Sequence, residues 1–502
     1  MFKSIKKVSL NAEQSTILIN MLKFVLFITL AYFPFFLHLN TLPIRIWDES
    51  RLAINAYEMF KNGNFLVTTF DNLPEMWNTK PPLLIWLQVG MFKLFGVNEV
   101  ALRLPSAIAG FLTTGVIMLF SIKYIKSYWF GLIVSLVLIT SYGYVNDHVT
   151  RTGDYDSLLI FFVVSYTLVF LVYVETQQTK YLHWFFVGLT LAILTKSVQG
   201  LIFLPALFIY VLTQKKLLKL NYKWIAINGA ISITVIAAYY LTREHYNPGF
   251  LTAVWENELG GRYTVAQEGN RGDFMMYYNL IVRFHYNDWY WLVPCGLVVG
   301  LVNKDVKIKK TTLYVTLLAV TYWLIISSSE TKCGWYEAPL FPYLAFLCGI
   351  IIYTVFVYIK EQLNTSKLVT YNVLPYVFLF VVFITPYEKI IQKTYAPVEY
   401  SWDVEFYKLS YFLKNAVKHE RSVANQYLCY DGYMAHLKWY INLLNDDKQP
   451  ISFKDFHGLV VGDKIITSQK HVQDYIEQNY ITQQISNDNN IKTYMINGVV
   501  TK

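Results

Sequence analysis

Charged residues are scarce in this chain, and this scarcity excludes an ordinary soluble protein. Asp, Glu, Lys and Arg make up 15% of the 502 residues, whereas hydrophobic residues make up 55% and aromatic residues 17%. Soluble domains carry about 25% charged residues. Most of the chain is therefore expected to lie in a lipid bilayer.

Cysteine is also rare, and the few cysteines form no pattern. Cys295, Cys333, Cys348 and Cys429 show no paired spacing, which excludes a disulfide framework and a CxxC metal site. The formal net charge of +9 does not indicate nucleic-acid binding, because the lysines form short clusters between apolar segments. Such clusters set the orientation of a membrane protein.

Hydrophobic runs long enough to cross a bilayer, roughly 20 residues each, recur along the chain. The first follows a basic N-terminus and has no small-residue cleavage site, so it is predicted to be an uncleaved span. About eleven spans are predicted, near residues 24–42, 103–122, 128–146, 157–175, 182–197, 199–214, 224–242, 284–303, 311–328, 336–359 and 368–386.

The apolar stretch 81–95 decides the topology. If it lies along the interface, the basic clusters between the later spans fall on the same side as the basic N-terminus. If it crosses, these clusters face outward, against the positive-inside rule. We therefore expect the stretch not to cross, which places the first loop (residues 43–102, with interfacial helices) on the external face of the membrane.

The composition changes after Tyr387. The pattern predicts strands at 422–430 and 459–467 and helices at 433–444 and 472–478. The sequence thus predicts an α-helical polytopic membrane domain, residues 1–387, followed by a small external α/β domain, residues 388–502.

An acidic pair, Asp48 and Glu49, follows the first span. Ionised groups at the lipid boundary are costly and usually face a polar cavity, so this pair is the candidate reaction centre. The next residues, up to Lys61, fit a short amphipathic helix lying on the membrane. The alternative is that the two carboxylates only cap this helix.

A second acidic pair, Asp154 and Asp156, lies between two later spans. Two aspartates separated by one residue could share a divalent cation or bind sugar hydroxyls. Asp156 could instead cap the helix that starts at Ser157. No other cofactor is indicated by the sequence.

A set of cations shares the predicted external side. Such groups could bind a phosphate as negative charge develops on it. Instead of binding phosphate, Lys332 could simply extend its ammonium group to the membrane interface. The set consists of Lys80, Lys196, Arg262, Arg271, Arg283 and Lys332.

Six short motifs occur in a fixed order and carry a family resemblance. They are W-D-E-x-R from Trp47, K-P-P-L-x-x-W from Lys80, R-L-P-S-A from Arg103, R-T-G-D-Y-D from Arg151, L-T-K-x-x-x-G from Leu194 and S-S-x-x-K-x-x-x-Y from Ser328. In this order the chain resembles the polyprenyl-phosphate-sugar-dependent membrane glycosyltransferases of GT-C architecture. The bacterial lipid A aminoarabinose transferases and the protein O-mannosyltransferases belong to this group.

This resemblance implies a polyprenyl-phosphate sugar donor, a lipid or protein acceptor, and inverting transfer on the external face. It further implies a catalytic Asp48 with Glu49 beside it, and Lys80, Lys332 and Arg262 near the donor phosphate. Asp154, Asp156 and Tyr336 would line the sugar or acceptor site. One departure is Thr79, where the aminoarabinose transferases have a glutamate. Glu75 is the nearest replacement in the sequence.

Two other readings of the sequence remain. Many spans with buried charges also describe a transporter or flippase of lipid-linked sugars. The other alternative is a membrane scaffold with an external binding domain. Transfer of labelled sugar to a lipid or protein distinguishes the enzyme from both.

Overall fold

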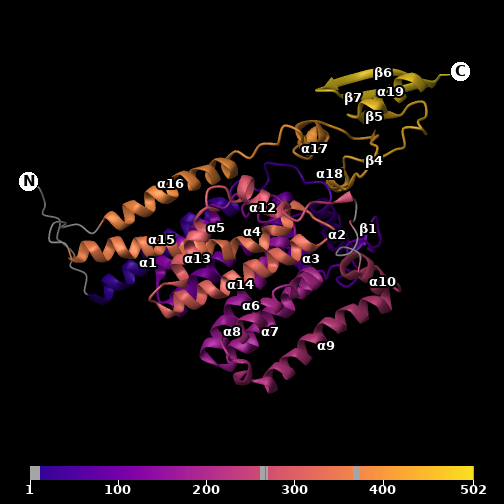
Figure 1. Cartoon of the computed structure of the whole chain (residues 1–502). Helices are drawn as coiled ribbons and strands as arrows, with labels where there is room; N and C mark the ends of the chain where they lie inside the picture. The colour runs from indigo at the N-terminus through magenta and orange to yellow at the C-terminus, as the bar shows by residue number, and fades with distance from the viewer. Residues whose placement is uncertain (1–11, 261–265, 267–268, 366–372, 501–502) are drawn as a thin grey trace, which may run out of the picture.

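The computed structural model describes residues 12–260, 266, 269–365 and 373–500, and it is mainly helical (Figure 1). Eight of the described helices are long and apolar enough to cross a membrane. They are α1 (Ala12–Phe36), α4 (Glu99–Phe120), α6 (Asp156–Thr176), α7 (Thr179–Lys196), α9 (Tyr222–Tyr246), α14 (Val306–Ser328), α15 (Phe341–Thr365) and α16 (Leu374–Tyr395).

Four apolar helices are shorter. They are α3 (Leu83–Phe95), α5 (Tyr128–Ile139), α8 (Leu204–Thr213) and α13 (Leu292–Leu301). Each predicted span overlaps a helix, but three of the spans overlap α5, α8 and α13. A multi-pass helical fold is therefore supported, and the count of eleven spans stays a prediction.

Helix α3 covers the stretch on which the topology depends. It begins after Pro82 and ends at Gly96, whose φ of 76° stops the helix. Its 13 residues extend about 20 Å, less than the roughly 30 Å of a hydrocarbon core. The helix by itself is thus too short to cross, and the position of the stretch along the interface stays a prediction.

Helix α6 packs against α4 and α7. Most of its side chains are buried, and a stripe at Phe161, Ser165, Val169 and Val172 is partly exposed. Helix α15 packs against α5, α13 and α14. An all-apolar helix of this kind is typical of a position surrounded by other helices.

Helix α2 (Asp48–Asn62) corresponds to the predicted amphipathic helix, but its environment differs from the prediction. It ends at Gly63 in the left-handed conformation, whose N–H donates to the Met59 carbonyl. We expected it to lie on the membrane with one face open. Instead α3 packs on one side and α18 (Ala435–Asp446) on another, so that polar residues such as Asn55 and Glu58 are buried as well.

The C-terminal region contains the predicted strands and helices together with elements that the pattern did not predict. A five-stranded mixed sheet has the order β4-β3-β5-β7-β6, in which β3 is parallel to β4 and β5 and the other pairs are antiparallel. Helix α18 packs near α2, and the sheet lies beyond it at one end of the molecule (Figure 1). The region consists of α17 (Val404–Val417), β3 (Gln426–Leu428), α18, β4 (Ile451–Phe453), β5 (Lys464–Thr467), α19 (Lys470–Asn479), β6 (Tyr480–Asp488) and β7 (Ile491–Val499).

Small elements connect these parts near the ends of the long helices. A two-stranded hairpin follows α2, and short helical turns follow α7, α9 and α14. They are β1 (Thr69–Phe70), β2 (Leu73–Pro74), η2 (Ser197–Leu201), α10 (Phe250–Val254), α12 (Met276–Leu280) and η7 (Gly334–Leu340).

Candidate active site

One pocket, here called the Asp48 pocket, collects side chains from five segments that are far apart in the sequence. It lies at the starts of α2 and α6, beside the loop before α3, the end of α7 and helix η7. Of the residues singled out in the sequence, it is lined by Asp48, Lys80, Asp154, Asp156, Lys196 and Tyr336. The other lining residues are Arg51, Leu52, Trp77, Asn78, Tyr155, Gln199 and Trp335.

Asp48 presents its carboxylate to solvent at this pocket. It is the first residue of α2, and the cap position belongs to Trp47, which makes no side-chain capping bond. The Asp48 side chain is 57% exposed, with the His148 Nδ1 atom 4.0 Å from Oδ2. Asp48 makes no hydrogen bond within the described chain, so its carboxylate is free to contact a substrate.

Glu49 has the opposite environment, because it is fully buried away from the pocket. Its carboxylate accepts hydrogen bonds from Arg103 Nε at 2.6 Å and Nη2 at 2.9 Å, and from the N–H groups of Arg45 and Gly153. Burial alone would raise the pKa of Glu49, but the Arg103 charge and these hydrogen bonds lower it. Glu49 therefore links α2 to α4 and to the loop before α6, and of the predicted acidic pair only Asp48 reaches the pocket.

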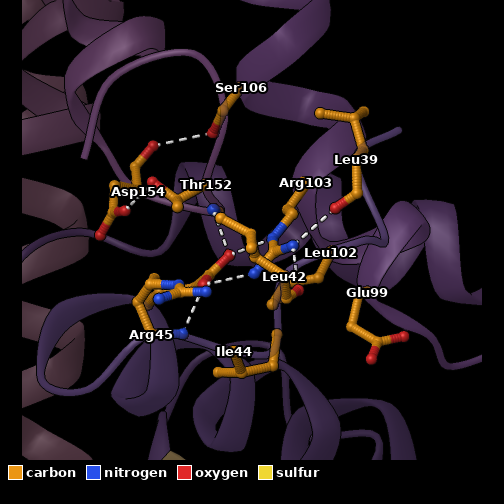
Figure 2. Close-up of polar contacts among 12 residues, drawn as sticks. Leu39, Leu42, Ile44, Arg45, Glu99, Leu102, Arg103, Ser106, Thr152 and Asp154 are labelled. Atoms are coloured by element: carbon orange, nitrogen blue, oxygen red, sulfur yellow. Dashed lines mark hydrogen bonds and ion pairs between the residues drawn. The ribbon is translucent and has the colours of Figure 1, made fainter. Parts of the chain in front are cut away.

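The arginines of two sequence motifs bind backbone carbonyls. Arg103 donates to the carbonyl oxygens of Leu39, Leu42 and Pro43 in the loop after α1, as Figure 2 shows for Leu39 and Leu42. Arg151 donates to carbonyl oxygens of residues 34, 35 and 37, at the end of α1. The Arg151 donors thus satisfy carbonyls that the end of a helix leaves unpaired.

Asp154, His148 and Asp48 form a group that could hold a divalent cation. One ligand atom from each lies within 4.8 Å of the others. Asp154 Oδ1 and His148 Nδ1 are 3.8 Å apart, and neither has a hydrogen-bond partner among the described residues. Carboxylate oxygens and an imidazole nitrogen are ligands that transition metals accept, so the residues fit a cation.

Burial controls the charge of Asp154. It raises the pKa of Asp154 to about 7, and the carboxylates of Glu49 and Asp48 act in the same direction, against His148 and Thr152. A bound cation would favour the ionised carboxylate instead.

The His148 ring is stacked on Trp335, with ring centroids 3.8 Å apart and planes inclined by 4°.

Asp156 does not join Asp154 in this group. Both of its carboxylate oxygens accept hydrogen bonds from Lys196 Nζ at 2.7 Å, and both side chains are buried. The two aspartates of the motif thus have different partners. A cation shared by Asp154 and Asp156, as the sequence suggested, would have to displace Lys196.

Lys80 lies in the pocket wall with an acidic partner that the sequence did not indicate. Its Nζ atom is 2.9 Å from Glu258 Oε1, and Glu258 is also 3.5 Å from the Thr79 hydroxyl. Glu75, the replacement suggested by the sequence, is instead bound to Arg51 at 2.8 and 2.9 Å. Glu258 is therefore the acidic residue beside the Thr79–Lys80 dipeptide.

The other predicted cations that the structure describes do not line the pocket. Lys332 is buried and donates to the Ser329 carbonyl, and it does not line the pocket. Arg262 lies outside the described residues. Lys80 and Lys196 are thus the lysines that the pocket contains.

Sequence reasoning missed His148, Trp335 and Glu258. Trp335 is the unspecified residue directly before Tyr336 within the last motif, so the motif already spanned it without singling it out. His148 and Glu258 belong to no motif, because their positions depend on contacts between segments distant in sequence.

Comparisons with known proteins agree with the resemblance. Residues 79–240, which contain Lys80, Asp154, Asp156 and Lys196, match the family described as dolichyl-phosphate-mannose-protein mannosyltransferase. An uncharacterised protein of Aquifex aeolicus is 24% identical over 72% of this chain and 68% of its own length. The undecaprenyl phosphate-alpha-4-amino-4-deoxy-L-arabinose arabinosyl transferase 1 of Proteus mirabilis is 25% identical over 65% of this chain and 58% of its own.

A solved structure shows the same fold. The crystal structure of ArnT from Cupriavidus metallidurans bound to undecaprenyl phosphate superposes with a TM-score of 0.69 at 15% identity. The match covers 94% of this chain and 97% of that one. The family segment, the relatives and the shared fold agree with the sequence-based recognition, and together they support a membrane glycosyltransferase of the GT-C type.

Proposed function

We propose that the chain transfers a monosaccharide from a polyprenyl-phosphate donor to a lipid A-like or other envelope acceptor, with inversion at the anomeric carbon. The observation that carries this proposal is the composition of the Asp48 pocket. One exposed carboxylate faces a space that also contains Lys80 and Lys196. The named relatives, which use or bind undecaprenyl phosphate, support the same donor class.

The pocket offers the groups that such a transfer needs. The acceptor hydroxyl loses its proton as its oxygen bonds to the anomeric carbon, and Asp48 can accept that proton. The bond between the anomeric carbon and the phosphate oxygen breaks, and the polyprenyl phosphate leaves as an anion. Lysine ammonium groups stabilise this developing charge. Attack opposite the leaving phosphate inverts the anomeric carbon.

Aromatic residues complete the pocket. Trp77, Tyr155, Trp335 and Tyr336 line it, and their rings provide apolar faces beside polar groups. A sugar ring needs both kinds of contact, with hydroxyls bound by polar groups and its C–H face against a ring. The lining therefore fits a monosaccharide.

The orientation of α6 supports transfer on the external face. Asp156 at its start lines the pocket, whereas Glu175 near its end pairs with Lys216 and Lys310. These ends are roughly 30 Å apart along a helix of this length. Basic clusters favour the cytoplasmic side, and this preference supports a pocket on the periplasmic side of the inner membrane.

Transfer to a protein Ser or Thr is the second candidate. It is favoured by the description of the matched family, which names a protein mannosyltransferase. Mass spectrometry of envelope lipids and glycoproteins, from cells with and without this chain, identifies the missing sugar and its attachment together. A loss confined to glycolipids supports the first candidate, a loss confined to glycoproteins the second, and no loss of either contradicts both.

Lys80→Ala is expected to raise the KM for the lipid-linked donor at least about 10-fold, because charge-assisted hydrogen bonds contribute roughly 1.5–3 kcal/mol. The KM for the acceptor should stay within about twofold. Steady-state kinetics with each substrate varied in turn measure both. Lys389→Ala is the control, since Lys389 pairs with Asp288 outside the pocket. An unchanged donor KM for Lys80→Ala would exclude a phosphate contact.

A divalent cation at Asp48, His148 and Asp154 would supply positive charge beside the two carboxylates. We expect EDTA to lower transfer by more than about 10-fold and Mn²⁺ to restore it. Electron paramagnetic resonance of Mn²⁺ added to the whole protein measures binding directly. His148→Ala should weaken this binding, whereas His471→Ala, at an exposed histidine paired with Asp431, should not. Full activity in EDTA would show that these groups act without a cation.

A further inference from the structure

The segment that leads into Asp48, residues 39–47, contains no helix or strand. Residues 43–45 in its middle are nevertheless buried. A buried backbone without secondary structure needs other partners for its N–H and C=O groups. Here side chains of the C-terminal region supply many of them.

Two tyrosine hydroxyls of the C-terminal region accept hydrogen bonds from this segment. The Ile44 N–H donates to the Tyr440 hydroxyl at 3.0 Å, and the Ile46 N–H donates to the Tyr407 hydroxyl at 3.0 Å. Tyr440 belongs to α18 and Tyr407 to α17. The Tyr440 hydroxyl in turn donates to Glu99 at 3.2 Å, which connects α18 to the start of α4.

Charged side chains of the same region bind the rest of the segment. Lys414 of α17 donates to the carbonyl oxygens of residues 40–42. The Arg45 guanidinium forms two hydrogen bonds with Glu399, at 2.7 and 2.8 Å. Both arrangements are charge-assisted and mostly shielded from water, so they hold the backbone firmly.

The residue directly before Asp48 has an unusual backbone conformation. Trp47 has φ 68° and ψ −111°, which is unfavourable for a bulky side chain and persists only where the surroundings impose it. The Trp47 ring is stacked on Tyr433, with centroids 4.5 Å apart and planes inclined by 17°. The direction of the Asp48 side chain therefore depends on a contact with the C-terminal region.

The membrane helices hold the opposite side of the segment. Arg103 of α4 binds carbonyl oxygens of the segment (Figure 2) and also binds the neighbouring Glu49. The segment is thus fixed between α4 on one side and helices α17 and α18 on the other.

We propose that Tyr407 and Tyr440 are positioning residues for the transfer reaction, through which the C-terminal region holds Asp48 in its reactive orientation. This inference rests on the proposed catalytic role of Asp48. It gives the C-terminal region a part in catalysis. Displacement of a reacting group by about 1 Å can cost 10²-fold in rate, so loosening the segment should lower kcat.

The test is the double variant Tyr407→Phe/Tyr440→Phe, assayed as the full chain in nanodiscs with a lipid-linked donor. Both rings remain, and only the two hydroxyls that accept the Ile44 and Ile46 N–H groups are removed. We expect kcat to fall roughly 10- to 100-fold, with the KM for the donor within about twofold. A purely structural role would change the yield or the melting temperature without this selective fall in kcat.

Tyr480→Phe is a closely matched control. The Tyr480 hydroxyl also accepts a backbone N–H, that of Leu459 at 3.3 Å, but Tyr480 lies at the start of β6, away from the segment. Its kcat should equal that of the wild type. A wild-type kcat for the double tyrosine variant overturns the proposal.

Two further variants keep the result interpretable. The first is Asp48→Asn, which separates the two proposals. Full activity of Asp48→Asn contradicts the proposed function. If Asp48→Asn is inactive and the double tyrosine variant is fully active, only the positioning role is contradicted. If the double tyrosine variant does not accumulate in membranes, Lys414→Met replaces it. This change releases the carbonyls of residues 40–42 and leaves no backbone N–H unpaired. A selective fall in kcat supports the proposal and an unchanged kcat overturns it.

Discussion

Asp48→Asn is expected to lower kcat by about 10³-fold, within the range attributed to general acid–base catalysis, and to leave the fold intact. The carboxamide keeps the size of the side chain but cannot accept the acceptor hydroxyl's proton. Since Asp48 is more than half exposed and makes no hydrogen bond within the described chain, its replacement should change the free energy of unfolding by less than about 0.5 kcal/mol. A reconstituted transfer assay and a thermal unfolding curve measure the two quantities.

The control for this variant is Asp455→Asn. Asp455 is an exposed aspartate of the C-terminal region that contacts His457 and lies outside the pocket. It should retain wild-type kcat. Normal transfer by Asp48→Asn at normal expression would remove the chemical basis of the proposed mechanism.

Much of the helical architecture follows from hydrophobicity alone. Every long apolar run overlaps a helix, because a backbone in lipid must satisfy its own hydrogen bonds. Pro82 and Gly96, which interrupt helices, also mark the two ends of the short helix α3. The β6–β7 hairpin was not predicted, since its outer strand is largely polar and exposed on both faces, and such a strand lacks the alternation that marks a half-buried one.

The site could be predicted only in part. Short motifs identified Asp48, Lys80, Asp154, Asp156 and Tyr336, and the fold brings all of them to one pocket. The ion-pair partners of these residues could not be predicted from the spacing of the motifs. Lys80, for example, pairs with Glu258, which lies far along the chain. Contacts of this kind depend on how helices pack, and no local pattern encodes them.

Helix geometry explains why Asp48 and Glu49 behave differently. Adjacent residues of an α-helix point about 100° apart. At the start of α2 one carboxylate therefore faces the pocket while the next is turned into the interior, where Arg103 binds it. Their adjacency in sequence suggested a shared role, whereas the structure gives them two.

Glu49→Gln is expected to destabilise the protein by roughly 3–5 kcal/mol, the cost of breaking a buried ion pair by removing one partner. Arg103 would keep its charge, buried at 2% exposure, without the carboxylate that neutralises it. Activity should fall in proportion to the folded fraction, and kcat per folded molecule should change far less than in Asp48→Asn. Equilibrium unfolding in mixed micelles and kinetics of the folded fraction measure these effects.

Glu58→Gln is the matched control for this stability effect. Glu58 lies on the same helix and is buried, but it forms no ion pair within the described residues and accepts only the Asn72 N–H, which a carboxamide oxygen can still accept. Its replacement should cost less than about 1 kcal/mol. Equal losses for Glu49→Gln and Glu58→Gln would contradict a special role for the Arg103 pair.

The pH dependence gives an independent check of the same pair. Because the pKa of Glu49 is lowered in the folded protein, its contribution to stability is present above the pKa of an unfolded glutamate, near 4.3. That contribution is lost as the pH falls through this value toward the folded pKa. The wild type should therefore lose more stability between pH 5 and pH 3 than Glu49→Gln does. Parallel losses in the two proteins would show that the Glu49–Arg103 pair does not hold α2 against α4 by its charge.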